Sequence, residues 1–262
     1  MLFFILLFSS ILSFYACQFE QKLNHLDTHD YRYFNQTYYL DFEPNQTLKH
    51  SNFIIVLDDF KAFQVEILQS KAVLQLKEAT HAHIIGLEHR FFGHSRPNEE
   101  ISKETQHFLL IQQFLFDIEH FIEYIQDNFC SEKCSVGIIG TGFGGSLATW
   151  SRIRYPHLVS SVWASSAILH FQPEFEIYDG ILAPKLNSFK SECFNNTKRI
   201  FDEIETILDD GDNETVLSLK EKFNFSEDQN DVSLLNTLGE VFLLPFQNKN
   251  WTPLLQDHCD SI

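Results

Sequence analysis

Two short apolar runs in the first third of the chain are separated by a longer segment that can form a helix. The runs are FIIVL at 53–57 and HIIGL at 83–87, and the segment between them covers residues 61–80. Continuous apolar runs of this length are typical of strands that are buried on both faces of a sheet. The pattern therefore predicts a strand–helix–strand unit with parallel strands.

The alternation of strands and helices continues beyond this unit. A strand is predicted within YRYFNQTYYLDF at 31–42, where polar and aromatic residues alternate. Further strands are predicted at 135–140 and 158–167, with a helix between them at 144–154. The clearest helix is predicted at 102–129. Its apolar face consists of Ile111, Phe114, Leu115, Ile118, Phe121, Ile122 and Ile125. We expect an α/β fold whose sheet is mainly parallel.

The character of the sequence changes after about residue 170. Residues 171–262 are charged and helical in pattern, and they contain no run that resembles a buried strand. Asp209, Asp210, Gly211 and Asp212 predict a turn within this part. We expect an α/β domain at 18–170 and an incomplete helical cap at 171–262.

The first seventeen residues, MLFFILLFSSILSFYAC, are uncharged and strongly apolar. The run is shorter than a membrane span usually requires, and polar sequence follows from Gln18. It predicts a signal peptide over residues 1–17, cleaved near Ala16 or Cys17, with no membrane segment afterwards. An uncleaved anchor is the alternative, because the start of the chain carries no basic residue.

Glycosylation sequons and cysteines both favour the secretory pathway. The sequons lie at Asn35, Asn45, Asn195, Asn213, Asn224 and Asn250. Without Cys17, four cysteines remain for an oxidising compartment, Cys130, Cys134, Cys193 and Cys259. Three pairings are open. We favour 130–134 with 193–259, because each bridge then stays within one predicted domain. A metal site is the competing interpretation, but the C-x3-C pair has no second pair of ligands at the spacing of a zinc finger.

The charge balance excludes one class of partner. The chain has 19 Lys and Arg against 36 Asp and Glu, a formal net charge of −17. Nucleic-acid binding requires clustered basic residues, and none are present. Gly140, Gly142 and Gly145 match a dinucleotide fingerprint, but the following strand does not end in the required acidic residue. His81 and His83 form H-x-H without further ligands. No cofactor or metal is expected.

The segment GIIGTGFGGSLATW at 137–150 joins an apolar strand to a helix through a glycine-dense turn. Residues 140–144, Gly-Thr-Gly-Phe-Gly, have the form of the nucleophile elbow G-x-S-x-G, with glycine at the apex instead of serine. Ser146 lies one helical turn further on, and its hydroxyl is expected to point into helix packing. Thr141 is expected to face the core. Neither residue is a good candidate nucleophile.

Five blocks of the sequence resemble a family of serine peptidases that includes lysosomal Pro-Xaa carboxypeptidase, dipeptidyl peptidase II and thymus-specific serine protease. The blocks are FEQKLNHLDTHDYRYFNQTYYL at 19–40, EHRFFGHSRP at 88–97, IQQFLFDIEHFI at 111–122, GTGFGGSLATWSRIRYPHLV at 140–159 and WASSAIL at 163–169. They occur in the same order as in the family and cover residues 19 to about 180.

The resemblance implies an α/β-hydrolase fold with a helical cap and a Ser-Asp-His triad that cleaves at prolyl bonds near a peptide terminus. Carried over by position, the nucleophile falls on Gly142, and one oxyanion donor falls on the backbone N–H of Phe143. The triad Asp and His are expected after the cap, so the chain is expected to stop before the last part of the sheet. VLDDFK at 56–61 replaces a glycine-rich loop of the family, which puts a second oxyanion contribution in doubt.

These observations favour a secreted or lysosomal, non-catalytic homologue that binds a peptide or a protein partner. One alternative is an active serine exopeptidase given as a partial or variant sequence. Another is a structural module that heterodimerises through an open sheet edge. Asp58 and Asp59 are interpreted as a polar strand exit, and Glu88, His89 and Arg90 as residues that hold a loop.

Overall fold

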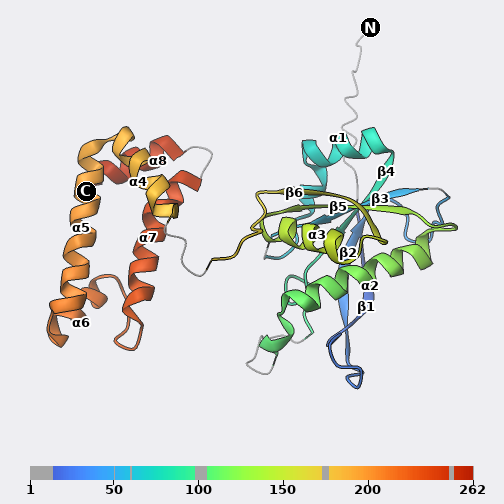
Figure 1. Cartoon of the computed structure of the whole chain (residues 1–262), viewed down its shortest axis with the longest axis horizontal. Coiled ribbons are helices and arrows are strands. Elements are labelled where there is room, and N and C mark those ends of the chain that lie inside the picture. Colours follow the sequence, from blue (N-terminus) through green and yellow to red (C-terminus); the bar gives the residue numbers. More distant parts are fainter. Residues whose placement is uncertain are drawn as a thin grey trace, which may run out of the picture. The chain divides into compact units, whose positions relative to one another are not determined.

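The computed structural model describes residues 14–49, 51–59, 61–97, 105–172, 177–247 and 251–261. The chain divides into two compact units, Met1–Phe171 and Gln172–Ile262. The first unit is an α/β unit built on a sheet, and the second consists of helices (Figure 1).

The sheet of the first unit has six strands in the order β1-β2-β4-β3-β5-β6. The strands are β1 (Tyr15–Lys22), β2 (Tyr33–Leu40), β3 (Asn52–Leu57), β4 (Ala82–Leu87), β5 (Ser135–Thr141) and β6 (Val159–Ser165). The last four run parallel, whereas β1 and β2 join the sheet as an antiparallel hairpin. This arrangement confirms the expected α/β fold with a mainly parallel sheet.

Helices cover the two faces of this sheet unequally. On one face, α2 (Ile111–Phe129) and α3 (Gly142–Arg154) enclose the larger core, in which Phe53, Ile55 and Phe121 are almost completely buried. On the other face, the shorter α1 (Lys71–Thr80) packs over a smaller core around β3 and β4. The strands β3 and β4 are therefore buried on both faces, which is why they read as continuous apolar runs.

The structure corrects two helix predictions. Instead of one helix over 61–80, a short 3-10 helix η1 (Val65–Gln69) precedes α1, which begins where the Ser70 hydroxyl accepts a hydrogen bond from Val73 N–H (3.4 Å). The helix predicted at 102–129 begins only at Ile111. Before it lies the 3-10 helix η2 (Gln106–Phe108), whose buried Phe108 packs in a separate hydrophobic cluster. Residues 98–104 lie outside the described residues.

Strand β1 was not predicted, because its buried positions are partly polar. Gln21 is completely buried, and its amide donates to Gln36 Oε1 at 2.9 Å and to the Asp117 carbonyl at 3.2 Å. Such a strand shows no apolar alternation. β1 begins at Tyr15, so cleavage at the predicted site near Cys17 would remove its first residues. Residues 1–13 of the predicted signal peptide lie outside the described residues.

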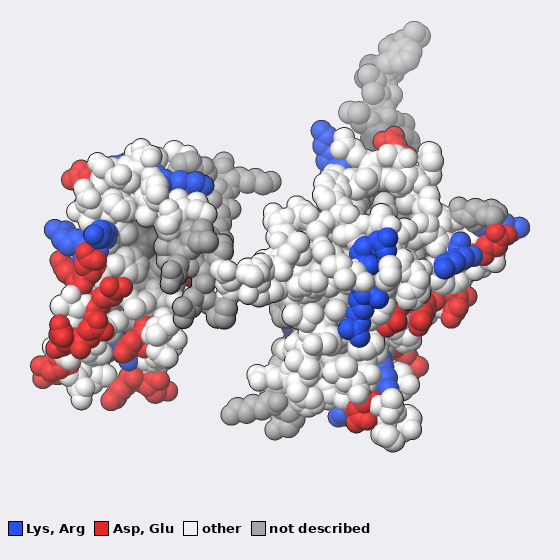
Figure 2. All heavy atoms as spheres, viewed as in Figure 1, with Lys and Arg blue, Asp and Glu red and all other residues white. Residues whose placement is uncertain are grey.

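The second unit contains α4 (Ile177–Phe189), α5 (Ser191–Asp210), α6 (Asn213–Lys222), α7 (Asp231–Gln247) and α8 (Trp251–Ser261). The predicted turn at Asp209–Asp212 separates α5 from α6. Acidic side chains gather around this turn on the surface (Figure 2). Within the described parts of the chain, no helix combines the length and the apolar character that crossing a bilayer requires.

Both favoured disulfides are present. Cys193–Cys259 joins α5 to α8, and Cys130–Cys134 closes the loop between α2 and β5. Cys17 is a free, half-buried thiol in β1. Five of the sequon asparagines, Asn35, Asn45, Asn195, Asn213 and Asn224, are exposed. Asn250 lies outside the described residues.

Candidate active site at the turn between β5 and α3

The glycine-dense segment forms the sharp strand-to-helix turn that its pattern predicts. β5 ends at Thr141 and α3 begins at Gly142, whose φ of +53° lies in the left-handed region. This conformation is strained for most residues with a side chain, and glycine adopts it at little cost. The apex of the turn therefore has the geometry of a nucleophile elbow, but no side chain projects from it.

The neighbouring glycines allow α3 to start very close to the sheet. A Cβ on Gly144 would lie 2.5 Å from the Asp58 carbonyl oxygen and 2.7 Å from that of Leu57, at the end of β3. A Cβ on Gly140 would overlap the Gly144 carbonyl. The first turn of α3 is thus pressed against the carboxyl end of β3, and this close approach explains why the segment is so rich in glycine.

The nearby hydroxyl groups do not take the place of a nucleophile at the apex. Ser146 is completely buried, and its Oγ donates to the Ile168 carbonyl at 2.7 Å and lies 3.4 Å from the Gly142 carbonyl. Thr141 is half-buried at the end of β5. Ser146 therefore contributes to helix packing, as its position in the sequence indicates.

Asp59 faces the apex of this turn from the loop that follows β3. The backbone N–H of Phe143 donates to Asp59 Oδ1 at 3.2 Å. A Cβ on Gly142 would lie 2.9 Å from Asp59 Oδ2 and 3.0 Å from Oδ1. The carboxylate thus lies beside the position of a nucleophile side chain and on the predicted oxyanion donor. The interpretation of Asp59 as a polar strand exit missed its contact with the elbow. The available signal was VLDDFK itself, where aspartates stand in place of the glycine-rich loop of the family.

The preceding residue, Asp58, holds the loop itself. Its side chain is buried, and its oxygens accept hydrogen bonds from the backbone N–H of Asp59 (2.8 Å) and of Gln64 (3.3 Å). Lys61 Nζ lies 3.6 Å from Asp58 Oδ1. The two adjacent carboxylates therefore differ in their contacts, since that of Asp58 closes its own loop and that of Asp59 reaches α3.

Glu88 and His89 hold the ends of β3 and β4 together. Glu88 accepts hydrogen bonds from Phe63 N–H (3.2 Å) and from the Ser95 hydroxyl (2.8 Å). His89 donates from Nε2 to the Asp58 carbonyl at 2.8 Å, because a carbonyl can only accept. Burial lowers the pKa of His89, so its imidazole is neutral. These contacts agree with the interpretation that this block holds a loop.

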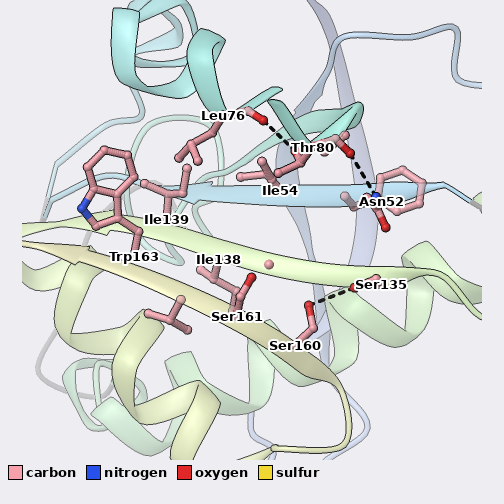
Figure 3. A pocket seen from close by; sticks show the side chains of 14 residues that line it. Asn52, Ile54, Leu76, Thr80, Ser135, Ile138, Ile139, Ser160, Ser161 and Trp163 are labelled. Carbon is pink, nitrogen blue, oxygen red and sulfur yellow. Dashed lines mark hydrogen bonds between the residues drawn. The ribbon is translucent and has the colours of Figure 1, made fainter. Parts of the chain in front are cut away.

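A groove lies elsewhere, on the α1 face of the sheet. It has a volume of about 480 Å³ and extends over the α1 face of the sheet, along β3, β5 and the edge strand β6 (Figure 3). Leu76 and Thr80 of α1 form one wall, while Ile139 and Trp163 form part of the floor. Trp163 remains 46% exposed. The described residues that line the groove are apolar or carry hydroxyl or amide groups, and none of them is titratable.

The described residues contain no group of three or more side chains arranged to hold a metal ion. His81 occupies the left-handed C-cap position of α1. His83 lies 3.5 Å from Asp41 Oδ1 and packs against the ring of Phe42. The H-x-H pair is thus engaged in local structure at both positions.

The sequence of the chain matches a known family of proteins and several relatives. The family model for serine carboxypeptidase S28 matches residues 21–248. Probable serine protease EDA2 of Arabidopsis thaliana is 25% identical over 241 residues, which cover 88% of this chain and 47% of that protein.

Two relatives from Mus musculus match shorter segments. Thymus-specific serine protease is 32% identical over 138 residues, which cover 51% of this chain and 27% of that protein. Lysosomal Pro-X carboxypeptidase is 30% identical over 154 residues, which cover 57% of this chain and 31% of that protein. The chain spans less than half the length of each of these three relatives.

Proposed function

Because this chain belongs to the serine carboxypeptidase S28 family, we propose that it is a non-catalytic member, a homologue of prolyl-specific exopeptidases that binds a peptide without cleaving it. The observation that carries this proposal is the glycine at the apex of the β5–α3 turn. Gly142 adopts the backbone conformation of an elbow residue and supplies no reacting atom. In a comparable triad, removing the serine lowers kcat by about a million-fold.

The position of the turn supports the binding part of the proposal. In open α/β sheets, ligands bind outside the carboxyl ends of the strands, where β3, β4 and β5 end in this chain. The loops there are well anchored by the buried residues Asp58, Glu88 and His89. A peptide would meet a formed surface that lacks a nucleophile.

The proposed location is the secretory pathway, in a secreted or lysosomal compartment. Two disulfides and five exposed sequon asparagines are the supporting observations within the chain. A lysosomal carboxypeptidase among the relatives supports the same location.

A fluorophosphonate serine probe tests the absence of catalysis. The full chain and mouse lysosomal Pro-X carboxypeptidase are incubated with the probe under the same conditions, and each is assayed on a mixture of proline-containing peptides. We expect the carboxypeptidase to label and the present chain to remain unlabelled, with peptides recovered intact from the bound fraction. Labelling of the unaltered chain together with cleavage at prolyl bonds would instead establish the alternative, an active exopeptidase.

A second candidate function is suggested by the edge strand β6. Among the described residues, no strand pairs with its outer edge, and Ser160, Ser161 and Trp163 are exposed along it. An unpaired edge beside an apolar groove is suited to a strand from another protein chain. In this second proposal, the chain heterodimerises by accepting a strand at β6.

The molar mass in solution, measured by light scattering on a tagged chain purified from secreting cells together with any protein bound to it, tests this assembly. We expect a complex larger than the 30.6 kDa chain that Trp163→Asp disrupts. Ile153→Asp is the matched control, because Ile153 is exposed on α3 and not at the groove. A single-chain mass before any substitution would contradict the proposal.

A further inference from the structure

We propose that Asp59 is an internal anion that occupies the oxyanion position of the former active site, and so blocks it independently of the missing nucleophile. This inference rests on the proposed function in one respect, namely that the β5–α3 turn is the former nucleophile position. It goes further by assigning a role to a residue outside the elbow. The Asp59 carboxylate excludes from the turn those ligands that present an oxyanion or a carboxylate.

The contacts of Asp59 place both of its oxygens at the turn. Oδ1 accepts a hydrogen bond from Phe143 N–H at 3.2 Å, the donor that an oxyanion would use. Oδ2 lies 2.9 Å from where a Cβ on Gly142 would be. A serine placed at this position would therefore meet a carboxylate before it met a substrate.

The backbone of the loop holds Asp59 in this place. The N–H of Asp59 donates to Asp58 Oδ1 at 2.8 Å, and its carbonyl accepts from Lys61 N–H at 2.7 Å. The buried Asp58 carboxylate also binds Gln64 N–H. None of these bonds uses the side chain of Asp59. Replacing Asp59 by alanine would leave these bonds in place and would remove the carboxylate from Phe143 N–H.

Charge explains why Asp59 is a block against anions in particular. The N-terminus of α3, a helix of 13 residues, presents N–H groups and the positive end of the helix dipole. A negative group is favoured there, and the Asp59 carboxylate already supplies it. A second anion would have to displace this carboxylate and would be repelled by it. Because Asp59 is exposed, its side chain has room to move aside.

The sequence of the chain allows one signal to report on this contact. Gly142–Phe143 is the only Gly–Phe pair among the 262 residues. Labelling glycine with ¹³C at the carbonyl and phenylalanine with ¹⁵N therefore isolates the Phe143 amide in an NMR spectrum of the full chain. Inorganic sulfate is the anion probe. The variants are Asp59→Ala and Asp59→Asn, and Lys61→Ala is the control in the same loop.

In the unaltered chain and in Lys61→Ala, we expect the Phe143 amide to be protected from hydrogen exchange and insensitive to sulfate. In Asp59→Ala, we expect exchange to be faster by about tenfold, as the loss of a hydrogen bond to a charged acceptor allows. Sulfate should then shift the Phe143 signal saturably. Asp59→Asn should also admit sulfate, because it keeps the shape of the side chain and loses its charge.

Two results would overturn the inference. One is a sulfate response in the unaltered chain as large as that in Asp59→Ala. The other is exclusion of sulfate by Asp59→Asn as complete as that by the carboxylate. Both can be read in variants whose remaining NMR signals show them to be folded. Labelling of the unaltered chain by the fluorophosphonate would contradict the proposed function. It would not change the response of the Phe143 amide to sulfate, so the two failures are distinguishable.

Discussion

Arg90 and Asp117 form a buried, two-pronged ion pair that ties the loop after β4 to helix α2. Arg90 Nε lies 2.7 Å from Asp117 Oδ2, and Nη2 lies 2.6 Å from Oδ1. Both side chains are almost completely buried, and Arg90 also donates to the carbonyls of Lys22 and Leu23. His25 Nε2 completes the site at 2.9 Å from Asp117 Oδ1. The pair thereby joins β1, β4 and α2.

Breaking this pair should destabilise the α/β unit strongly. Arg90→Met leaves the Asp117 carboxylate buried without its main partner, and the removal of one member of a buried pair costs about 3–5 kcal/mol. Urea unfolding would show a much lower midpoint. Arg32→Ala is the control, since the Arg32 side chain is 64% exposed and its ion pair with Asp30 should contribute little to the midpoint. Equal effects of the two substitutions would contradict this interpretation.

A methyl group at Gly144 should disturb the packing of α3 against β3. The new Cβ would meet backbone carbonyl oxygens at 2.5 and 2.7 Å, and neither oxygen can turn away as a flexible side chain could. We expect Gly144→Ala to lower the free energy of unfolding by about 1–3 kcal/mol, the usual range for overpacking.

The control for Gly144 is Gly239→Ala in α7. Among the described residues, no atom beyond the adjoining backbone of the helix lies within 4 Å of the added Cβ there, so this substitution should be neutral or stabilise its helix by up to about 1 kcal/mol. Thermal unfolding followed by circular dichroism compares the two variants. A Gly144→Ala chain as stable as the parent would mean that α3 does not lie so close to the sheet.

The Cys193–Cys259 bridge should contribute most of the constraint on the helical unit. It spans 66 residues, and the loss of unfolded-chain entropy at that separation corresponds to about 4 kcal/mol. Its sulfurs lie in a small buried cluster with Leu186 and Leu255. Replacing both cysteines by serine should therefore release α8, which hydrogen exchange in α5 and α8 would detect.

The Cys130–Cys134 bridge provides the comparison, because it closes a loop of only 4 residues. The same entropy argument gives about 2 kcal/mol for it. Its double serine variant should leave exchange in α5 and α8 unchanged. If that variant released these helices as much as the loss of Cys193–Cys259, the assignment of the constraint would be wrong.

The buried, neutral His89 should make the α/β unit sensitive to acid. In the unfolded chain, histidine takes up a proton near its ordinary pKa of about 6.5. In the folded chain, burial lowers the pKa of His89, so the proton is taken up only at lower pH. Between these two values the unfolded state binds more protons, and the free energy of unfolding therefore falls as the pH drops below about 6.5.

His89→Gln removes this proton-binding difference and should flatten the dependence of stability on pH. Urea unfolding at about pH 7.5 and about pH 5 measures the slope for each variant. His29→Gln is the control, since the side chain of His29 is 89% exposed. A slope that is the same with and without His89 would show that this imidazole does not account for the acid sensitivity.

The elements that the sequence predicted well are those in which buried apolar residues recur at regular spacing along a short segment. The apolar face of α2 and the runs that became β3 and β4 follow from contacts that each segment makes with one core, so their spacing is visible locally. The turn at Gly142 was also visible locally, since Gly140, Gly142, Gly144 and Gly145 lie within six residues of one another. β1 was missed because Gln21 is buried through hydrogen bonds to residues far along the chain.

The sequence by itself indicated the alternation of strands and helices from β2 to β6, the family resemblance and the absence of a side chain at the apex of the elbow, and it favoured one disulfide pairing among three. Only the tertiary structure decided that Asp59 meets Phe143, 84 residues away. That contact exists because β3 lies next to β5 in the sheet, so the loop after one strand faces the helix that follows the other. Strand neighbours are set by packing of the whole sheet, which no local pattern of residues records.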